Sequence, residues 1–487
     1  MNRRITAAIA VAAGVLGAVG PSAQAAGPFQ ATGFKVGEVT DSTAIVWTRL
    51  TAKARRHPAD GPMVTFEYAA AGKGKKGKRR NVVAVVYPPG KTVADIRDAV
   101  PGAPGEVRVL YRTLGAKGWR QTDWRAVDAK RDFTRQFTLS ELAAGATHEI
   151  RVESRGPSGG AVGQSLDGRF QTAPAPDKSA HVVFTVSTGQ GYGSRDHPNG
   201  YAIYPQMLAL QPSFFVHTGD ILYYDRLAKT IALARYHWQR TYSLPTNVDF
   251  HRRVASYFIK DDHDTWQNDC WPTMKRDNMF EFTFAQGLGV FREQVPMGKR
   301  TYRTFRWGRD LQIWLVEGRD FRSANTDPDG PDKTIWGAEQ KAWFKKTVTA
   351  SDATFRILIS PTPIVGPDRP NKNDNHSNKG FTTEGRELRR FIGPQKNMAV
   401  ICGDRHWQYM SIHPYSKVRE YSCGAVSDKH AGGWRQDNVV TSHHRYLNVI
   451  GGFLSVTVAR AGGKPAATFR FHDVKGKVRY EDRLIAK

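Results

Sequence analysis

The chain has 487 residues, with 71 Lys and Arg against 45 Asp and Glu, so its formal net charge is +26 at pH 7. This length exceeds what one hydrophobic core usually organises, so two domains are expected. The positive charge favours contact with anionic polymers or lipid head groups, or it serves solubility alone. The three cysteines, Cys270, Cys402 and Cys423, argue against a disulfide scaffold but leave room for one bridge.

Residues 1–25 have the three parts of an export signal. Arg3 and Arg4 precede an apolar run from Ile5 to Val19, and Ala23-Gln24-Ala25 forms a small-x-small cleavage site. The alternative, a membrane anchor, is disfavoured because the run is shorter than the roughly 20 residues that cross a bilayer. We expect a signal peptide, with Sec or twin-arginine export left open, and a mature protein that is secreted or held in the cell envelope or periplasm. No later segment is long and apolar enough to span a membrane.

Residues 30–172 are expected to form an N-terminal β-sandwich domain, because short strands recur between turn-forming segments. The run Lys73 to Arg80 is strongly basic and is interpreted as an exposed loop. No recognised nucleic-acid module accompanies it. The predicted strands are Thr43–Thr48, Val64–Tyr68, Phe133–Leu139 and His148–Val152.

A stiff break at residues 173–177, beginning Ala-Pro-Ala-Pro, is expected to link the sandwich to a second domain at residues 178–487. There the pattern changes to short apolar strands that alternate with helices, which predicts a layered α/β fold. The predicted strands are Val182–Val186, Ser213–Val216, Ala255–Ile259, Leu311–Val316, Phe355–Ile359 and Met398–Ile401. The predicted helices are Ile203–Leu210, Thr230–Arg240, Gly337–Lys345 and Thr383–Phe391.

Three of these strands run directly into acidic residues and histidines. The segments that follow them are His217-Thr218-Gly219-Asp220, Asp261-Asp262-His263-Asp264 and Gly403-Asp404-Arg405-His406. In an open α/β sheet, the loops at the carboxyl ends of the strands share one crevice, so these side chains can meet. A lone Gly-Asp after a strand is usually only a turn, whereas four titratable residues directly after an apolar strand need solvent or partners.

Gathered carboxylates repel one another unless a cation keeps them ionised. Carboxylate and imidazole ligands suit first-row transition metals, and a remainder rich in oxygen suits Ca²⁺ or Mg²⁺. Two or more such ions can bind a phosphate and lower the pKa of an attacking water. His263 or His406 can then protonate the leaving oxygen.

At these motifs the sequence resembles the PhoD-like alkaline phosphatases, a branch of the calcineurin-like metallophosphoesterases. The resemblance covers most of the mature chain, and it implies a four-layer α/β/β/α catalytic domain preceded by a small fibronectin-like β-sandwich. It also implies iron and calcium ions acting on phosphate esters. The matching segments are Thr40 to Leu50, Gly219 to Tyr223, Asp261 to His263, Tyr302-Arg303 with Arg306 to Gly308, Arg319 to Arg322, Trp336 to Gln340 and Gly403 to His406.

The resemblance also implies roles for single residues. Asp220 would bridge metals, Tyr223 would bind iron through its phenolate rather than pack as an ordinary tyrosine, and His263 would be catalytic. The other implied metal ligands are Asp261, Asp262, Asp404 and His406. Arg303 is the first choice for gripping the phosphate, with Arg319 and Arg322 as second choices or structural ion-pair partners. Asn375, His376 and Asn378 lie in a predicted loop that is either part of the substrate site or an ordinary polar loop.

One position departs from the family pattern. Where the family has a cysteine that ligates iron, the turn Ser187-Thr188-Gly189-Gln190 has Gly189. Either Thr188, Gln190, Tyr192 or an unrecognised residue fills the place, or the metal differs.

The sequence therefore predicts an exported metal-dependent phosphoesterase that hydrolyses phosphate mono- or diesters by metal-activated water. The alternative is an exported, non-catalytic protein that binds a polyanion or carbohydrate on the same scaffold. The missing cysteine favours the alternative, and the retained acids and histidines favour the enzyme. The natural substrate, ester class, metal identity, oligomeric state and role of the N-terminal domain are not encoded in these patterns.

Overall fold

The computed structural model describes residues 27–69 and 81–487. The predicted signal peptide and the basic run Lys73 to Arg80 lie outside the described residues. Within the described part of the chain, no helix combines the length and the apolar character that crossing a membrane requires.

Most of the N-terminal strands form two antiparallel sheets that pack on each other. One sheet has the order β1-β2-β8, and the other has the order β10-β9-β5-β6 with β7 paired on β5. Val36 and Val46 of the first sheet share a core with Val109 and Val152 of the second. The predicted β-sandwich is therefore present. The strands are β1 (Phe34–Gly37), β2 (Ala44–Arg49), β5 (Glu106–Thr113), β6 (Arg120–Gln121), β7 (Arg125–Ala126), β8 (Thr134–Leu139), β9 (Thr147–Arg155) and β10 (Val162–Gln171).

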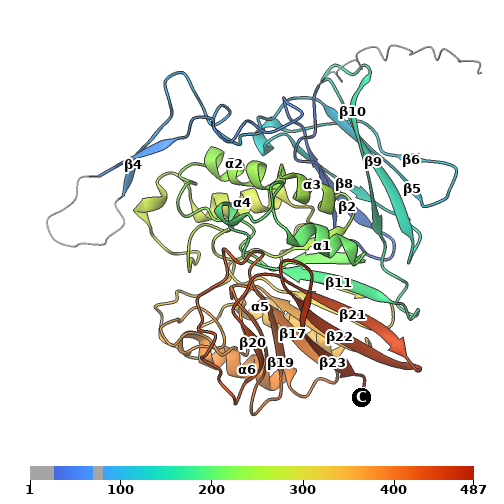
Figure 1. Ribbon diagram of the computed structural model, residues 1–487, viewed down its shortest axis with the longest axis vertical. Helices are drawn as coiled ribbons and strands as arrows, with labels where there is room; N and C mark the ends of the chain where they lie inside the picture. Colours follow the sequence, from blue (N-terminus) through green and yellow to red (C-terminus); the bar gives the residue numbers. More distant parts are fainter. Residues whose placement is uncertain (1–26, 70–80) are drawn as a thin grey trace, which may run out of the picture.

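A separate hairpin of β3 (Thr65–Tyr68) and β4 (Val82–Val86) projects from this region (Figure 1). It leads into a segment in which Ile96 and Ala99 pack against Leu233 and Tyr236 of a helix in the second half of the chain. The hairpin region therefore packs on the second half of the chain rather than on the sandwich core.

The remaining strands form two larger mixed sheets. The first has the order β13-β12-β11-β21-β22-β23, and the second has the order β14-β15-β16-β17-β19-β18-β20. The first contains β11 (Val182–Ser187), β12 (Phe214–His217), β13 (Ala255–Phe258), β21 (Phe453–Ala461), β22 (Lys464–His472) and β23 (Val478–Ile485). The second contains β14 (Arg303–Trp307), β15 (Leu311–Leu315), β16 (Phe355–Ser360), β17 (Met398–Cys402), β18 (Gln408–Ile412), β19 (Arg419–Cys423) and β20 (His444–Asn448).

Helices cover the outer faces of both sheets (Figure 1). On the first sheet, Tyr204 of α1 and Phe250 of α3 pack with Phe215 of β12. On the second, Phe344 of α5 and Leu388 of α6 pack with strand residues of β15 and β17. The helices are α1 (Ile203–Ala209), α2 (Ile231–Tyr242), α3 (Pro245–His251), α4 (Phe284–Gln294), α5 (Gly337–Thr349) and α6 (Thr382–Ile392). Short 3-10 helices span Ala129–Arg131, Tyr192–Ser194, Asp277–Met279 and Lys379–Phe381.

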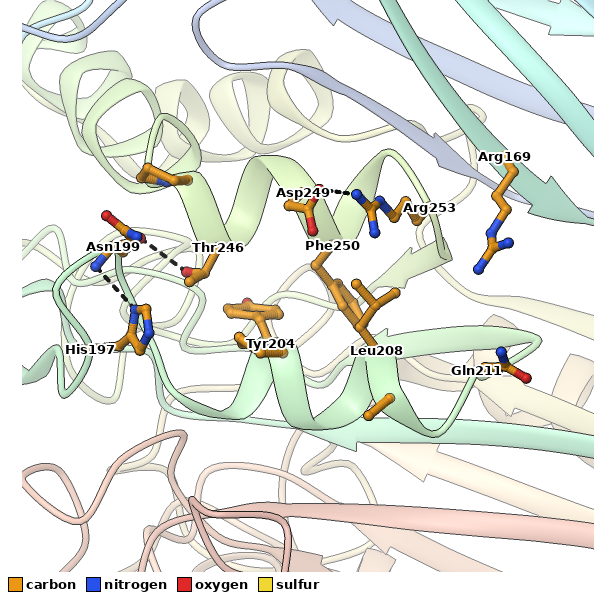
Figure 2. Close-up of a pocket in the computed structure, with 13 residues that line it drawn as sticks. Arg169, His197, Asn199, Tyr204, Leu208, Gln211, Thr246, Asp249, Phe250 and Arg253 are labelled. Atoms are coloured by element: carbon orange, nitrogen blue, oxygen red, sulfur yellow. Dashed lines mark hydrogen bonds and ion pairs between the residues drawn. The ribbon is translucent and has the colours of Figure 1, made fainter. Parts of the chain in front are cut away.

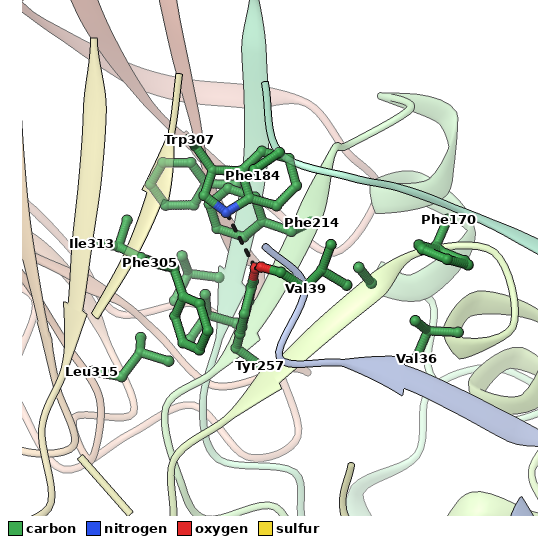
Figure 3. Packing of buried hydrophobic residues seen from close by; sticks show 14 of the residues in the cluster. Val36, Val39, Phe170, Phe184, Phe214, Tyr257, Phe305, Trp307, Ile313 and Leu315 are labelled. Atoms are coloured by element: carbon green, nitrogen blue, oxygen red, sulfur yellow. Dashed lines mark hydrogen bonds between the residues drawn. The ribbon is translucent and has the colours of Figure 1, made fainter. Parts of the chain in front are cut away.

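Aromatic side chains hold the two sheets face to face (Figure 3). The rings of Phe214 and Trp307 have centroids 4.6 Å apart, and those of Tyr257 and Phe305 are 4.5 Å apart. Burying each of these rings stabilises the fold by about 1.5–3 kcal/mol. The layers are thus helix, sheet, sheet, helix, which is the predicted α/β/β/α architecture.

Each strand and helix predicted for the second half is present, with shifted ends. Helix α5 continues beyond Lys345 to Thr349, because Phe344 and Val348 place two buried side chains one turn apart on the same face. Strand β14, strands β18 to β23 and helices α3 and α4 were not predicted. The cysteines Cys270, Cys402 and Cys423 are buried and free, so the structure contains no bridge between them.

Candidate metal centre

The acidic segments meet at one place, although their strands belong to different sheets. Asp220 follows β12 and Asp262 follows β13 in the first sheet, whereas Asp404 follows β17 in the second. The sequence argument placed all three at the crevice of one open sheet; the structure instead uses the shared edge of two packed sheets. A bridge from Thr188 to Ala425 joins the sheets at this edge.

The two Gly-Asp pairs allow the loops to approach closely. A side chain at Gly403 would place its Cβ 2.5 Å from the Thr218 hydroxyl and 2.8 Å from the Thr218 carbonyl oxygen. A Cβ at Gly219 would lie 2.8 Å from the Asp261 backbone nitrogen. Both loops therefore require glycine at this position.

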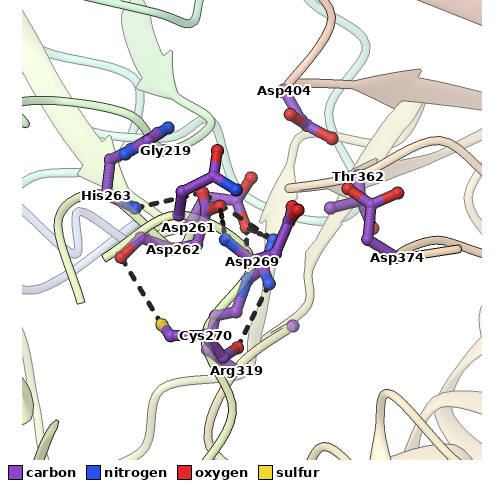
Figure 4. A network of polar contacts seen from close by, with 12 residues as sticks. Gly219, Asp261, Asp262, His263, Asp269, Cys270, Arg319, Thr362, Asp374 and Asp404 are labelled. Atoms are coloured by element: carbon purple, nitrogen blue, oxygen red, sulfur yellow. Dashed lines mark hydrogen bonds and ion pairs between the residues drawn. The ribbon is translucent and has the colours of Figure 1, made fainter. Parts of the chain in front are cut away.

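Five predicted residues form two overlapping groups that can each hold a cation. The first comprises Asp220, Asp262 and His263, and the second comprises Asp220, Asp261 and Asp404, with ligand atoms within 4.8 Å of one another in each group. Figure 4 shows the Asp261 to His263 segment facing Asp404 from the other sheet. Asp220 belongs to both groups, as a bridging ligand would.

Three buried carboxylate oxygens in these groups lack hydrogen-bond partners among the described residues: Asp220 Oδ1, Asp261 Oδ2 and Asp404 Oδ2. Asp404 Oδ2 lies 2.5 Å from Arg405 Nη2 in an ion pair. The other oxygen of Asp261 accepts a hydrogen bond from Arg319 Nε at 2.7 Å, which fixes the orientation of the carboxylate. A buried carboxylate oxygen without a partner is costly, so the arrangement fits a bound cation.

Burial and mutual repulsion set the proton affinities of the acids. Burial raises the pKa of the Asp220 and Asp404 carboxyl groups to about 7. Burial also raises the pKa of Asp261 well above its usual value. Burial opposes ionisation of Asp262 as well, but the charges of His263 and Arg319 hold its pKa below the usual value. A cation would replace the protons on the first three acids.

Tyr223 stands beside this cluster with two histidines. Its hydroxyl lies 3.1 Å from Asp220 Oδ2, 3.1 Å from His406 Nε2 and 2.7 Å from His430 Nε2. His406 Nε2 is 3.5 Å from Asp220 Oδ2. Tyr223 is therefore surrounded by polar ligand-type atoms rather than packed as an ordinary core tyrosine.

His263 is held by an acid that the sequence argument missed. Its Nδ1 lies 2.5 Å from Asp225 Oδ2, and its ring centroid lies 4.3 Å from that of Tyr223. Burial disfavours the charged imidazole, but the carboxylates of Asp262, Asp225 and Asp220 outweigh it and raise the pKa of His263 well above 6.5. The pairing fixes the ring and favours its protonated form.

The two predicted phosphate-binding arginines are engaged elsewhere. Arg303 donates to Glu38 Oε1 at 2.9 Å and to the carbonyl oxygens of Thr301 and Phe258. Arg319 is fully buried against Asp261. Protein groups contact both guanidinium groups, and a role of either arginine in substrate binding stays a prediction.

The predicted loop residues Asn375 and His376 are also fully buried. Asn375 Nδ2 donates to Asp368 Oδ2 at 2.8 Å, and His376 Nε2 lies 2.9 Å from Glu384 Oε2. The neighbouring Asp374 pairs instead with Lys372, whose Nζ lies 3.2 Å from it. The segment is therefore held by neighbouring protein groups.

Three further residues border the centre: Asp225, Arg369 and His430. Asp225 lies two positions beyond the matching segment Gly219 to Tyr223, so it adjoins a motif already singled out. The charge of Arg369 contributes to the low pKa of His406, after the larger effects of burial, His263 and Arg405. His430 lies seven positions after the end of β19, too far for the pattern of polar residues directly after a strand to indicate it.

A cavity of about 600 Å³ lies away from this centre, between α1, α3 and β10 (Figure 2). Its lining includes Arg169, His197, Asp249 and Arg253. None of the predicted site residues lines it, and Arg253 pairs there with Asp249 at 2.8 Å. The cavity therefore carries no part of the predicted chemistry.

Comparisons with known proteins point in one direction. The model of the PhoD-like phosphatase family matches residues 184–448. Among solved structures, that of PhoD superposes with a TM-score of 0.70 at 15% identity, covering 96% of this chain and 91% of that chain. Purple acid phosphatase PPD1 from yellow lupin (Lupinus luteus) seeds superposes with a TM-score of 0.62 at 10% identity, covering 93% and 74%. No curated protein matches the chain significantly by sequence.

Proposed function

Since the chain belongs to the PhoD-like phosphatase family and is thereby a phosphoric ester hydrolase, we propose that its hydrolysis of phosphate esters depends on metal ions. The ions are held by Asp220, Asp261, Asp262 and Asp404, together with Tyr223 and His406. The observation that carries this proposal is the convergence of four acids from two sheets, three of which have a buried oxygen without a hydrogen-bond partner among the described residues. Iron and calcium are the ions that the sequence resemblance suggested.

Metal ions bound there would polarise the phosphate and lower the pKa of the attacking water. The protein supplies the geometry around them. Asp220 belongs to both ligand groups and so fixes their spacing. Arg319 and Arg405 neutralise the outer sides of Asp261 and Asp404, at 2.7 Å and 2.5 Å. The acids are thereby oriented toward one another before a substrate arrives.

His263 is the proton donor for the leaving oxygen in this proposal. Asp225 holds its Nδ1, so Nε2 is the nitrogen that remains to serve the substrate. A hydrogen-bonded carboxylate of this kind fixes the orientation of an imidazole and stabilises its charged form. His406 is disfavoured for this task, because its Nε2 already faces Asp220 and Tyr223.

Arg369 replaces Arg303 as the proposed grip on the phosphate. Its guanidinium lies beside the Trp407 ring at 5.6 Å and close to Gly433, and its side chain is 31% exposed. Its charge acts on His406, so it lies near the centre, where its Nε is 3.5 Å from Asp368 Oδ1. A guanidinium matches two phosphate oxygens at once.

The surroundings of the substrate follow from the sequence. The leader-like residues 1–25 support export, and a mature enzyme outside the cytoplasm would meet phosphate esters of the envelope or medium. The net charge of +26 would concentrate anionic substrates, including polymers, near the protein.

The proposal is tested with purified protein and aryl phosphate mono- and diesters, before and after chelation. We expect chelation to abolish turnover and one or more of Fe, Ca²⁺, Mn²⁺ or Zn²⁺ to restore it. Asp220→Asn should lower kcat by at least about 1,000-fold, because a ligand shared by both groups is weakened. The matched control is Asp60→Asn at an exposed position. Full activity after exhaustive chelation, with no metal left by elemental analysis, would defeat the proposal.

A further inference from the structure

His430 is the nearest polar neighbour of the Tyr223 hydroxyl. Its Nε2 is 2.7 Å from the phenolic oxygen, closer than His406 Nε2 or Asp220 Oδ2. The rings of His406 and His430 have centroids 4.3 Å apart. Donor atoms from three separate segments therefore lie around the Tyr223 hydroxyl.

The spacing of these atoms suits a coordination sphere. The Tyr223 hydroxyl lies 2.7–3.1 Å from Asp220 Oδ2, His406 Nε2 and His430 Nε2, and His406 Nε2 lies 3.5 Å from Asp220 Oδ2. Metal–donor bonds of about 2.0–2.2 Å give neighbouring ligands separations of about 2.8–3.6 Å in octahedral and tetrahedral sites. Two imidazoles, a phenolate and a carboxylate are donors that first-row transition metals accept.

The turn that lacks the expected cysteine is shaped around His430. A Cβ at Gly189 would lie 3.0 Å from His406 Cδ2 and 3.4 Å from His430 Cδ2, and a Cβ at Gly191 would lie 2.8 Å from His430 Nδ1. The two glycines thus leave the space in which the imidazole lies. The imidazole of His430 thus lies next to the position where a side chain of residue 189 would begin.

The backbone around His430 is tied to the same turn. Val426 N donates to Gly189 O at 3.4 Å, and Ser427 Oγ donates to Ser194 O at 2.7 Å. His430 N in turn donates to Ser427 O at 3.0 Å. These bonds hold the imidazole in place before any ion binds, as a metal ligand requires.

We propose that His430 is a metal ligand which, with Asp220, Tyr223 and His406, holds a transition-metal ion in place of the missing thiolate. The inference rests on the metal-dependent function proposed above and specifies its donor set as nitrogen and oxygen. The sequence alternatives Thr188 and Gln190 donate instead to carbonyl oxygens of Gly219 and Ile221.

The test measures metal binding directly. His430→Ala and the larger His430→Gln are prepared as apoproteins, and Co²⁺ and Zn²⁺ affinities are measured by competition with a chromophoric chelator. We expect both variants to bind one equivalent at least about 100-fold more weakly, beyond the loss typical of groups around a ligand. His443→Ala, on a turn away from the centre, is the control. The Co²⁺ spectrum of the native protein should show no thiolate charge-transfer band.

The outcomes separate this inference from the broader proposal. If the native protein binds metal and Asp220→Asn loses it, while folded His430→Ala and His430→Gln keep native stoichiometry and affinity, His430 only hydrogen-bonds Tyr223 and the inference is overturned. A thiolate band in the Co²⁺ spectrum would also overturn it. If the native apoprotein binds neither ion and activity survives chelation, the metal-dependent function itself fails. Thermal melting of each variant verifies that the fold is retained.

Discussion

Asp220 and Asp404 share an unusual backbone conformation, with φ of 54° and 63°. Such values are uncommon outside glycine, and aspartate tolerates them better than most residues. In both cases a glycine precedes the acid at a point where two loops nearly touch. This backbone conformation directs each carboxylate away from its strand and toward the centre, so the Gly-Asp pair orients the carboxylate.

A substitution at Gly403 tests whether its loop must lie close to the Thr218 loop. Gly403→Ala would place Cβ 2.5 Å from the Thr218 hydroxyl and 2.9 Å from the Pro361 carbonyl oxygen, so the loops must separate. We expect the free energy of unfolding to fall by about 1–3 kcal/mol and metal affinity to fall with it, since Asp404 is displaced. Urea unfolding and metal titration measure the two effects.

The control for that change is Gly289→Ala within α4. Nothing lies within 4 Å of a Cβ at this position. The change should stabilise the helix by about 0.5–1 kcal/mol, because alanine loses less backbone entropy than glycine. Equal effects of the two substitutions would contradict the argument from loop contact.

At the scale of elements, the N-terminus of α6 is held by a buried carboxylate. Glu384 Oε2 accepts from Ile335 N at 2.5 Å and lies 2.9 Å from His376 Nε2, and Oε1 accepts from the Thr334 hydroxyl. Burial opposes ionisation, but these donors outweigh it and lower the pKa of Glu384 to about 2. Glu384 therefore joins α6 to the segments on either side of it.

This carboxylate predicts a pH dependence of stability. A pKa lowered on folding stabilises the native state above the ordinary pKa near 4.5, and the contribution is lost as pH falls from there through about 2. At pH 7 it is about 3 kcal/mol. Glu384→Gln should thus destabilise the protein at pH 7 and progressively less below pH 4.5. Urea unfolding across this range measures it, with exposed Glu141→Gln as control; a difference independent of pH would refute the assignment.

Some strands could be predicted from the sequence and others could not, for physical reasons. Strands β11, β12, β13 and β17 are buried on both faces, so each has a continuous apolar run from which it was predicted. Strand β23, with alternating exposure, and the nine-residue β21 and β22 lie far from any recognised motif and were missed. The acids at strand ends were found for the same reason that they converge: each follows a strand whose carboxyl end faces one edge.

The contacts between residues far apart in the sequence could not be predicted. Whether Arg303 faces a substrate or a buried acid depends on where β1 packs, and nothing local to Arg303 encodes that. His430 lies 241 positions after Gly189, counting from the printed numbering, so only the folded chain shows that one takes the place of the other. Contacts between such distant positions are seen only in the folded structure.

For the molecule as a whole, one buried ion pair helps to join the sandwich to the catalytic half. Strand β1 lies along β13, and Tyr257 Oη donates to Val39 O at 2.6 Å. Beside this contact, Arg303 Nη2 lies 2.9 Å from Glu38 Oε1, with side chains only 8% and 11% exposed. A cation fixed there needs its carboxylate, because a charge left alone in a buried position is costly.

Glu38→Gln should therefore lower the free energy of unfolding by about 3–5 kcal/mol, since it leaves Arg303 buried without a counter-charge. The double variant Glu38→Gln/Arg303→Met removes both charges and should recover part of the loss. Neither group contacts the acidic cluster, so kcat/KM per folded molecule should stay unchanged at saturating metal. Urea unfolding and steady-state kinetics measure the two quantities together. If the stable double variant folds yet loses turnover by orders of magnitude, Arg303 serves the phosphate after all, and the contact with Glu38 is secondary.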